Sequence, residues 1–168
     1  TRRSDETVER ALAALEGVDE PFFLWMHLWD PHDQIQTPEK SFMPADKDVF
    51  ELDPQGKPRR DENGKPVLKR PMTALYAAEI RYMDHQIGVL FDALRHRGLW
   101  DDTLVAVTAD HGQGLNDHGW AAHRILYQEQ IRVPLILRMP GGAHGQVVYE
   151  LVRTVDLAPT VLDYAGLE

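Results

Sequence analysis

The sequence has no cysteine, and none of its 168 residues belongs to an apolar run near the roughly 20 residues that a membrane-spanning helix needs. Disulfide bonds and thiolate metal sites are therefore excluded, although this absence says little about the compartment. No amino-terminal apolar segment has the pattern of a signal peptide, and residues 1–5 lead directly into a polar helix start. The sequence by itself therefore leaves the localisation undetermined.

Positive charge is the scarcer sign, since 18 lysines and arginines face 27 acidic residues and the formal net charge is −9. This balance argues against nucleic acid as a general partner. A small anionic substrate stays compatible with it, because a bound metal and local basic groups can reverse the field inside a site. The length and composition are those of a single globular domain, which we expect to span residues 1–168.

Hydrophobic periodicity predicts the secondary structure. Helical spacing predicts helices over 4–15, where Ser4 with Asp5 or Thr7 can form the cap, over about 74–98, and over 154–166. Continuous apolar runs of strand length predict buried strands at 21–28, 103–108 and 133–138. Helices thus alternate with buried strands, which predicts an α/β fold with a mostly parallel sheet flanked by helices.

Residues 33–71 differ from the rest of the chain because they combine many charges with six prolines. We expect an irregular surface insertion there, and loops of this length often serve a functional site. No internal repeat is evident from the sequence. His27 lies inside the first apolar run, where we expect a hydrogen-bonded core histidine.

Asp110 and His111 follow the strand predicted at 103–108, and two glycines and His118 come soon after. Open α/β sheets bind ligands at the carboxyl ends of their strands. Carboxylate and imidazole groups are suitable ligands for a divalent cation. Taken alone, an Asp-His pair is as often a turn and cap as a site. Position and chemistry together predict that Asp110 and His111 form half of a metal site.

Two further clusters could join this site. His32 lies just beyond the strand predicted at 21–28, so in one parallel sheet it would emerge at the same edge as Asp110. His123 and Arg124 lie in the loop before the strand predicted at 133–138. Imidazoles and a guanidinium around a metal suit a tetrahedral oxyanion.

The chain resembles the sulfatase family, within the alkaline phosphatase superfamily. The resemblance is carried, in the family's order, by 22–32 (FFLWMHLWDPH), 76–84 (YAAEIRYMD), 104–112 (LVAVTADHG), 132–136 (RVPLI) and 155–160 (VDLAPT). Each motif alone is weak, whereas the ordered set is specific and covers most of the chain outside residues 33–71. The resemblance implies an alkaline-phosphatase-like α/β fold, present here as a partial domain from the carboxyl side of the catalytic domain.

The resemblance also implies residue roles. Asp110 and His111 match metal ligands of the family. His32 and His123 match catalytic residues that reach the substrate's sulfate or its leaving-group oxygen. His118 matches a histidine of the pocket, and with Arg124 we assign it to substrate binding.

The activity implied is hydrolysis of a small-molecule or glycan sulfate ester, through a formylglycine nucleophile and a divalent metal. Ca²⁺ is favoured, with Mn²⁺ and Mg²⁺ as alternatives. The family's enzymes are often exported, which slightly favours a periplasmic or extracellular parent protein. Neither a nucleic-acid partner nor a membrane span is expected.

The chain departs from the family in one important respect. Formylglycine is made from the first residue of a Cys/Ser-x-Pro/Ala-x-Arg element, and neither Ser4 nor Ser41, the only serines, fits that pattern. The family's paired amino-terminal Asp ligands are missing too. We therefore expect a fragment of a longer enzyme, inactive in isolation, with an exposed sheet edge through which it could self-associate.

Two other functions remain open. A phosphodiesterase, phosphonate hydrolase or phosphatase of the same superfamily would use the same Asp-His element with a different nucleophile. A non-catalytic metal-binding domain would have lost the catalytic half.

Overall fold

The computed structural model describes residues 2–18, 21–32, 39–69 and 72–167. The chain forms two compact units, one made of Thr1–Asp101 with Gly114–Ala122 and the other of Asp102–Gln113 with His123–Glu168. No helix in the described part of the chain is long and apolar enough to cross a membrane.

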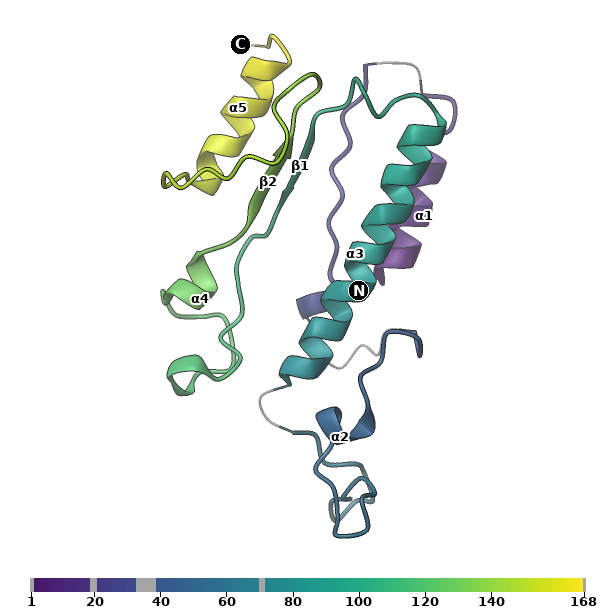
Figure 1. Ribbon diagram of the computed structural model, residues 1–168, viewed down its shortest axis with the longest axis vertical. Helices are drawn as coiled ribbons and strands as arrows, with labels where there is room; N and C mark the ends of the chain where they lie inside the picture. Colours follow the sequence, from purple (N-terminus) through teal and green to yellow (C-terminus); the bar gives the residue numbers. More distant parts are fainter. Residues whose placement is uncertain (1, 19–20, 33–38, 70–71, 168) are drawn as a thin grey trace. The chain divides into compact units, whose positions relative to one another are not determined.

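Two helices, α1 (Ser4–Ala14) and α3 (Thr73–His96), lie side by side and form the core of the first unit (Figure 1). Val8 and Leu15 pack with Leu90 and Leu94. These residues recur at helical spacing, so each helix turns one apolar face toward the other. Helix α3 ends where predicted, because Gly98 takes a left-handed φ of +71° just beyond it.

The amino terminus of α1 is capped from a distant part of the chain rather than by its own residues. The carboxylate of Asp30 accepts hydrogen bonds from the backbone N–H and the hydroxyl of Ser4, and both residues are buried. A carboxylate at this end also meets the positive end of the helix dipole. The expected cap by Ser4 with Asp5 or Thr7 is therefore wrong, since the acceptor comes from the turn that precedes His32.

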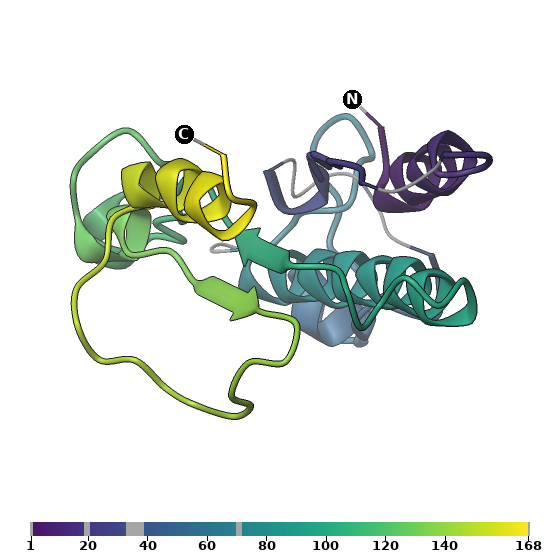
Figure 2. The same ribbon diagram turned by 90° about the horizontal axis from the view of Figure 1, so that it is seen from above.

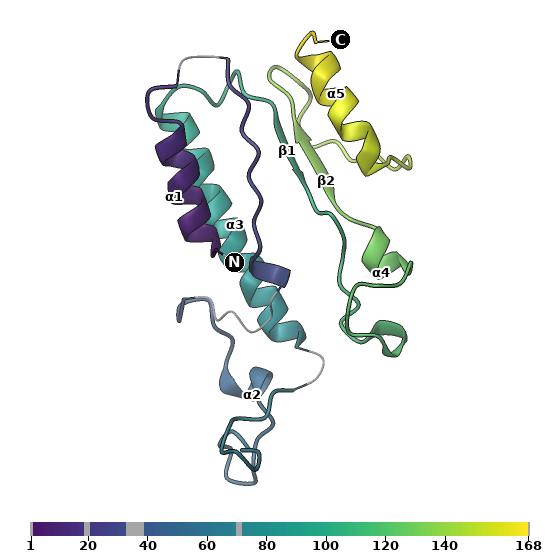
Figure 3. The same cartoon turned by 180° about the vertical axis from the view of Figure 1, so that it is seen from behind.

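The segment at 22–29 is extended, but it is not the paired strand that the sequence predicted. The segment runs alongside α1 and α3 (Figure 3). Its side chains alternate, so that Phe22, Leu24 and Met26 pack against the α1–α3 core while Phe23 and Trp25 are 77% and 75% exposed. His27, expected in the core, is also exposed, because odd-numbered positions face away from the helices. The periodicity of two is that of a strand, but no described segment pairs with it.

The described part of the expected insertion, residues 39–69, contains a short helix, α2 (Asp46–Val49), and two turns of the same sequence pattern. The turns cover 53–58 (DPQGKP) and 61–66 (DENGKP). In each, the aspartate carboxylate accepts hydrogen bonds of 2.9 Å from the backbone N–H groups two and four residues later. The two turns are thus a short tandem repeat that the sequence analysis did not find.

The second unit is built on two strands, β1 (Val105–Thr108) and β2 (Leu135–Arg138), which pair antiparallel, with Val105 opposite Arg138 (Figure 2). Both strands were predicted, but the expected parallel arrangement does not apply to this pair. The physical reason is the connection. Between the strands the chain forms only the one-turn elements η2 (Asp117–Gly119) and α4 (Gln128–Ile131), without the long crossover helix that parallel neighbours usually need.

The second unit closes with η3 (Thr154–Asp156) and α5 (Leu157–Tyr164). This is the final helix predicted over 154–166. Pro159 lies in its first turn, as expected from its fixed φ. Gly166, with a φ of +69°, lies just beyond its end.

Candidate functional site

Asp110 and His111 lie just beyond the carboxyl end of β1, so their place in the second unit is fixed by that strand. Asp110 Oδ1 accepts a 2.9 Å hydrogen bond from the backbone N–H of His111, as an aspartate in a turn commonly does. Its other oxygen, Oδ2, is 3.7 Å from His111 Nε2. The Asp110 side chain is 74% exposed and that of His111 35% exposed. Asp110 Oδ2 and His111 Nε2, the two atoms that could bind a metal, therefore lie next to each other on side chains that solvent can reach.

A backbone hydrogen bond determines which ring nitrogen of His111 carries the proton. Nδ1 lies 2.8 Å from the carbonyl oxygen of Gly112, which can only accept, so Nδ1 is the donor. A neutral imidazole protonated at Nδ1 carries its lone pair on Nε2, the nitrogen beside Asp110. Backbone hydrogen bonds of this kind commonly set the tautomer of metal-binding histidines.

His123 stacks on His111, with ring centroids 4.0 Å apart and an interplanar angle of 16°. Its Nδ1 lies 2.9 Å from Oε1 of Gln113. Asp110, His111, Gln113 and His123 thus form one cluster inside the second unit, although the loop 114–122 separates His123 from the other three in sequence. Arg124 follows His123 and is exposed.

The tight approach of two backbone segments holds this cluster together. A Cβ on Gly112 would come within 2.1 Å of the carbonyl oxygen of Glu129, so only glycine fits there. The Gly112 N–H donates to the carbonyl of Gln130 at 2.7 Å. The buried side chain of Gln130 in turn accepts a 3.0 Å hydrogen bond from the N–H of Ile125. Gln130 therefore connects the backbone next to His111 with the backbone next to His123.

His118 belongs to the loop 114–122, which groups with the first unit. Its side chain is exposed, and its backbone is left-handed with a φ of +53°. Leu115 and Asn116 are left-handed too, with φ of +46° and +75°. Such conformations cost non-glycine residues free energy and often mark functional loops.

His32 ends the short helix η1 (Asp30–His32) in the first unit. Its ring contacts that of Trp29 at an interplanar angle of 35°, with centroids 4.3 Å apart, and its side chain is exposed. The buried Asp30 anchors this turn to α1, and η1 packs against α3. His32 is therefore an accessible imidazole on a firmly held turn.

The described residues contain no group of three or more acidic or histidine side chains that could hold a metal by itself. Asp110 and His111 nonetheless fit a divalent cation, because ligand distances of about 2.0–2.6 Å let one ion bridge donors that are 3.7 Å apart. They would supply two of its ligands. Oxygen-rich shells suit Ca²⁺, Mg²⁺ or Mn²⁺, and one imidazole shifts the preference toward Mn²⁺ or Zn²⁺.

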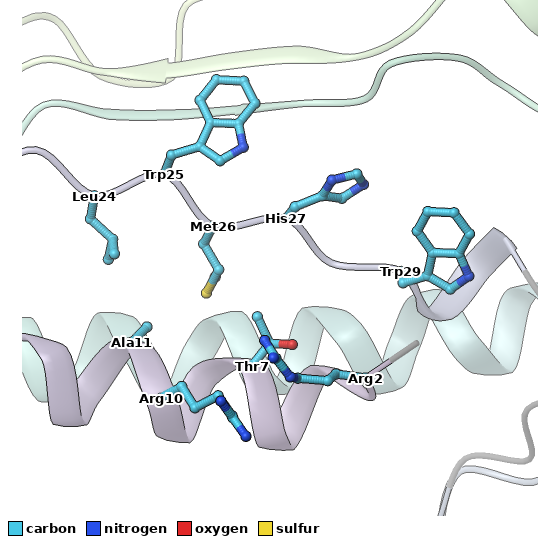
Figure 4. Close-up of a pocket in the computed structure, with 9 residues that line it drawn as sticks. All are labelled: Arg2, Thr7, Arg10, Ala11, Leu24, Trp25, Met26, His27 and Trp29. Carbon is cyan, nitrogen blue, oxygen red and sulfur yellow. The ribbon is translucent and has the colours of Figure 1, made fainter.

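A separate cleft of about 600 Å³ lies between α1 and the extended segment in the first unit (Figure 4). Leu24 and Met26 point toward α1, whereas Trp25 and His27 point away from it. None of the candidate site residues lines this cleft. Trp29, whose ring contacts that of His32, contributes one wall.

The sequence did not point to Gln113, which belongs to the cluster, or to Gln130, which supports it. Neither has a signature of its own, since most glutamines are exposed and make no specific contact. The proximity of Gln113 to the Asp-His element was the only available signal. Its contact with His123 depends on how the loop returns, and that is decided by tertiary structure.

Comparisons with known proteins identify the family of the whole chain. A sequence model of the sulfatase family matches residues 2–167. The chain is 33% identical over 166 residues to an arylsulfatase from Clostridium perfringens, an alignment that covers 88% of this chain and 34% of that protein.

Among solved structures, the chain is similar to two phosphonate monoester hydrolases. The one from Agrobacterium radiobacter matches all of this chain and 40% of its own, with a TM-score of 0.75 and 24% identity. The one from Silicibacter pomeroyi is 40% identical, with a TM-score of 0.55, over 58% of this chain and 19% of its own. The chain thus spans well under half the length of these proteins, and the expected alkaline-phosphatase-like α/β fold is confirmed.

Proposed function

The chain belongs to the sulfatase family, and we propose from this that it is the part of a sulfate ester hydrolase that carries Asp110, His111 and His123. The observation that supports this most directly is the stack of His123 on His111, with the Asp110 carboxylate beside it. Two imidazoles and a carboxylate share one accessible edge at the end of β1. This is the kind of donor set that a cation and a tetrahedral anion could share.

The role proposed for each side chain follows from its chemistry. Asp110 and His111 would hold a divalent metal, with His111 binding through Nε2. When bound, this cation would stabilise negative charge on the transferring group. His123 would reach the sulfate or the leaving oxygen, and His123 or His32 would donate a proton to the departing alcohol. His118 and Arg124 would contribute to substrate binding.

We propose Ca²⁺ as the metal, with Mn²⁺ or Mg²⁺ as alternatives, and a formylglycine nucleophile. No residue of this sequence can supply that nucleophile, so it would come from a part of the protein other than this chain. The substrate would be a small-molecule or glycan sulfate ester. The arylsulfatase similarity over 88% of the chain supports sulfate as the transferred group.

The proposed function is tested by aryl sulfate hydrolysis with the protein that carries this chain. The substitutions Asp110→Ala and His123→Ala should each lower kcat/KM by about 100-fold or more, as expected for a metal ligand or a general acid. The exposed His144→Ala in the same unit is the matched control and should leave activity unchanged. Unchanged turnover in the Asp110 variant would contradict the proposal, as would turnover by the isolated chain.

One alternative has its own support, because the Silicibacter pomeroyi protein that is 40% identical is a phosphonate monoester hydrolase. The ratio of kcat/KM for an aryl sulfate to that for a phosphonate monoester distinguishes the two. A ratio below one would favour phosphoryl transfer. Absence of both activities, with metal binding retained, would favour a non-catalytic metal-binding domain.

We also propose that the isolated chain self-associates. The backbone groups of residues 22–28 make no hydrogen bonds within the described part of the chain. The outward side of this segment exposes Phe23 and Trp25. An extended, unpaired and apolar segment is a ready template for pairing with another chain.

A further inference from the structure

The hydrogen bond between His123 and Gln113 determines which ring nitrogen of His123 carries a proton. Gln113 contributes Oε1, an amide oxygen that can only accept, and Nδ1 of His123 lies 2.9 Å away. Nδ1 must therefore carry hydrogen. In a neutral ring this leaves the lone pair on Nε2, so this contact fixes the tautomer of His123.

The position of the His123 ring is restricted by three contacts. His111 stacks against its face at 4.0 Å. The backbone two residues later is tied to Gln130 through the N–H of Ile125. Stacking alone allows the ring to turn by half a rotation and exchange its two nitrogens, because the face of the ring stays the same. The hydrogen bond to Gln113 is directional and therefore distinguishes one orientation of the ring from the other.

We propose that Gln113 is a positioning residue, which keeps the Nδ1 proton of His123 in a hydrogen bond and thereby makes Nε2 the nitrogen that exchanges a proton with the substrate. As a general acid the ring is the imidazolium, protonated on both nitrogens; it gives the Nε2 proton to the departing oxygen and becomes the neutral, Nδ1-protonated ring. The catalytic part of this statement rests on the proposed function, whereas the tautomer assignment stands without it. A glutamine suits this role because its neutral amide supplies a directional acceptor without adding a second carboxylate next to Asp110. Gln113 acts through His123 and contacts no reacting atom itself.

The tautomer is measured by NMR on the 168-residue chain with ¹⁵N-labelled histidine, at a pH where the rings are neutral. The His123 signals are assigned by their loss in His123→Asn. We expect a protonated, pyrrole-type Nδ1 and an unprotonated, pyridine-type Nε2. The opposite pattern in the unmutated chain would overturn the proposal directly, whether or not any variant folds.

Three variants sharpen the test. Gln113→Leu removes the acceptor at similar volume and should move His123 toward the Nε2-protonated form. Gln113→Glu keeps an acceptor oxygen at the same chain length and should retain the Nδ1-protonated form. Gln128→Leu, at an exposed glutamine of α4 in the same unit, is the matched control and should match the unmutated chain. Retention of the original tautomer in folded Gln113→Leu would refute the role of Gln113.

A kinetic measurement on the sulfatase that carries this chain tests the catalytic part. Gln113→Leu should lower kcat by about 10- to 100-fold, as expected for the loss of a group that orients an active-site histidine, with a smaller effect on KM. Gln113→Glu should restore most of kcat. A changed tautomer with unchanged kcat would overturn the positioning role. If the unmutated protein lacks sulfatase activity, the proposed function fails while the NMR result still decides the assignment of Gln113.

Discussion

At Gly112, next to the candidate site, the close approach of two backbone segments leaves no room for a side chain. Replacing Gly112 with alanine would bring a Cβ to 2.1 Å from the Glu129 carbonyl oxygen, a backbone atom that cannot turn aside. We expect Gly112→Ala to destabilise the second unit by about 1–3 kcal/mol, the usual cost of overpacking. Urea unfolding, followed by the NMR signals of His111 and His123, measures the effect.

The control for this substitution is Gly88→Ala in α3. No atom lies within 4 Å of a Cβ built there, and the residue is helical. Alanine should therefore be neutral or stabilising by up to about 1 kcal/mol, since it is the better helix former. Equal destabilisation by both substitutions would show that the close approach at Gly112 is not the cause.

The buried Tyr82 makes the stability of the first unit depend on pH. Its ring is buried, Arg3 donates a 2.8 Å hydrogen bond to its hydroxyl, and burial raises its pKa above the ordinary value. Because the folded chain holds this proton more tightly than the unfolded chain, stability is retained below the ordinary tyrosine pKa of about 10 and declines above it.

We therefore expect the free energy of unfolding of the first unit to decline as the pH rises above the ordinary tyrosine pKa of about 10. The decline should be shallower in Tyr82→Phe, which has no proton to lose. Denaturant titrations from pH 8 to 11 test this, and identical slopes in the two proteins would contradict it.

At the scale of elements, the turn that carries His32 and helix α1 stabilise each other. Asp30→Ala would remove both hydrogen bonds to Ser4 and leave the buried amino end of α1 without an acceptor. We expect a loss of about 1–3 kcal/mol of stability, from the helix cap and the buried donors together. Ser4→Ala should cost less, because the backbone bond persists.

Hydrogen exchange at the start of α1 measures this effect locally. Asp5→Ala is the control, since its 3.3 Å contact with Arg3 is a partly exposed ion pair and should change stability by no more than about 0.5 kcal/mol. Equal protection in Asp30→Ala and Asp5→Ala would show that Asp30 does not act as a cap.

The spacing of apolar residues in the sequence located some helices and strands correctly, but it did not show which segments pair. Helices α1 and α3 and strands β1 and β2 lie where the sequence predicted them, because their apolar spacing reflects local geometry. The segment 22–29 has the alternation of a strand but lacks a partner. Pairing is a relation between two segments, and the spacing within one of them carries no information about it. The parallel direction expected of the sheet was undetermined for the same reason.

For the whole molecule, the exposed apolar side of residues 22–29 predicts self-association. Light scattering after size-exclusion chromatography at micromolar concentration should give a mass above that of one chain. The double substitution Phe23→Ser and Trp25→Ser should shift it toward the monomer, because both side chains are about three-quarters exposed. Leu126→Ser, at another exposed apolar residue, is the control. A monomeric unmutated chain would contradict this prediction.

The candidate site was only partly predictable. Asp110 and His111 were found from residue type and from their position after an apolar run, and His123 from its place in the loop before the strand predicted at 133–138. The contact of His123 with His111 could not be derived in that way, since the loop 114–122 separates Gln113 from His123. The roles assigned to Asp110, His111 and His123 stay predictions, as do those of His32, His118 and Arg124.

The sequence by itself determined the α/β class, the extents of the main helices and strands, and the identity of a family whose ordered motifs span the chain. Each of these depends on local spacing or on short contiguous motifs. Only the tertiary structure decided the distant cap of α1 by Asp30, the antiparallel pairing of β1 with β2, and the Gln113–His123 contact. These features join residues far apart in sequence, so their free energy depends on the path of the intervening chain, which no local pattern encodes.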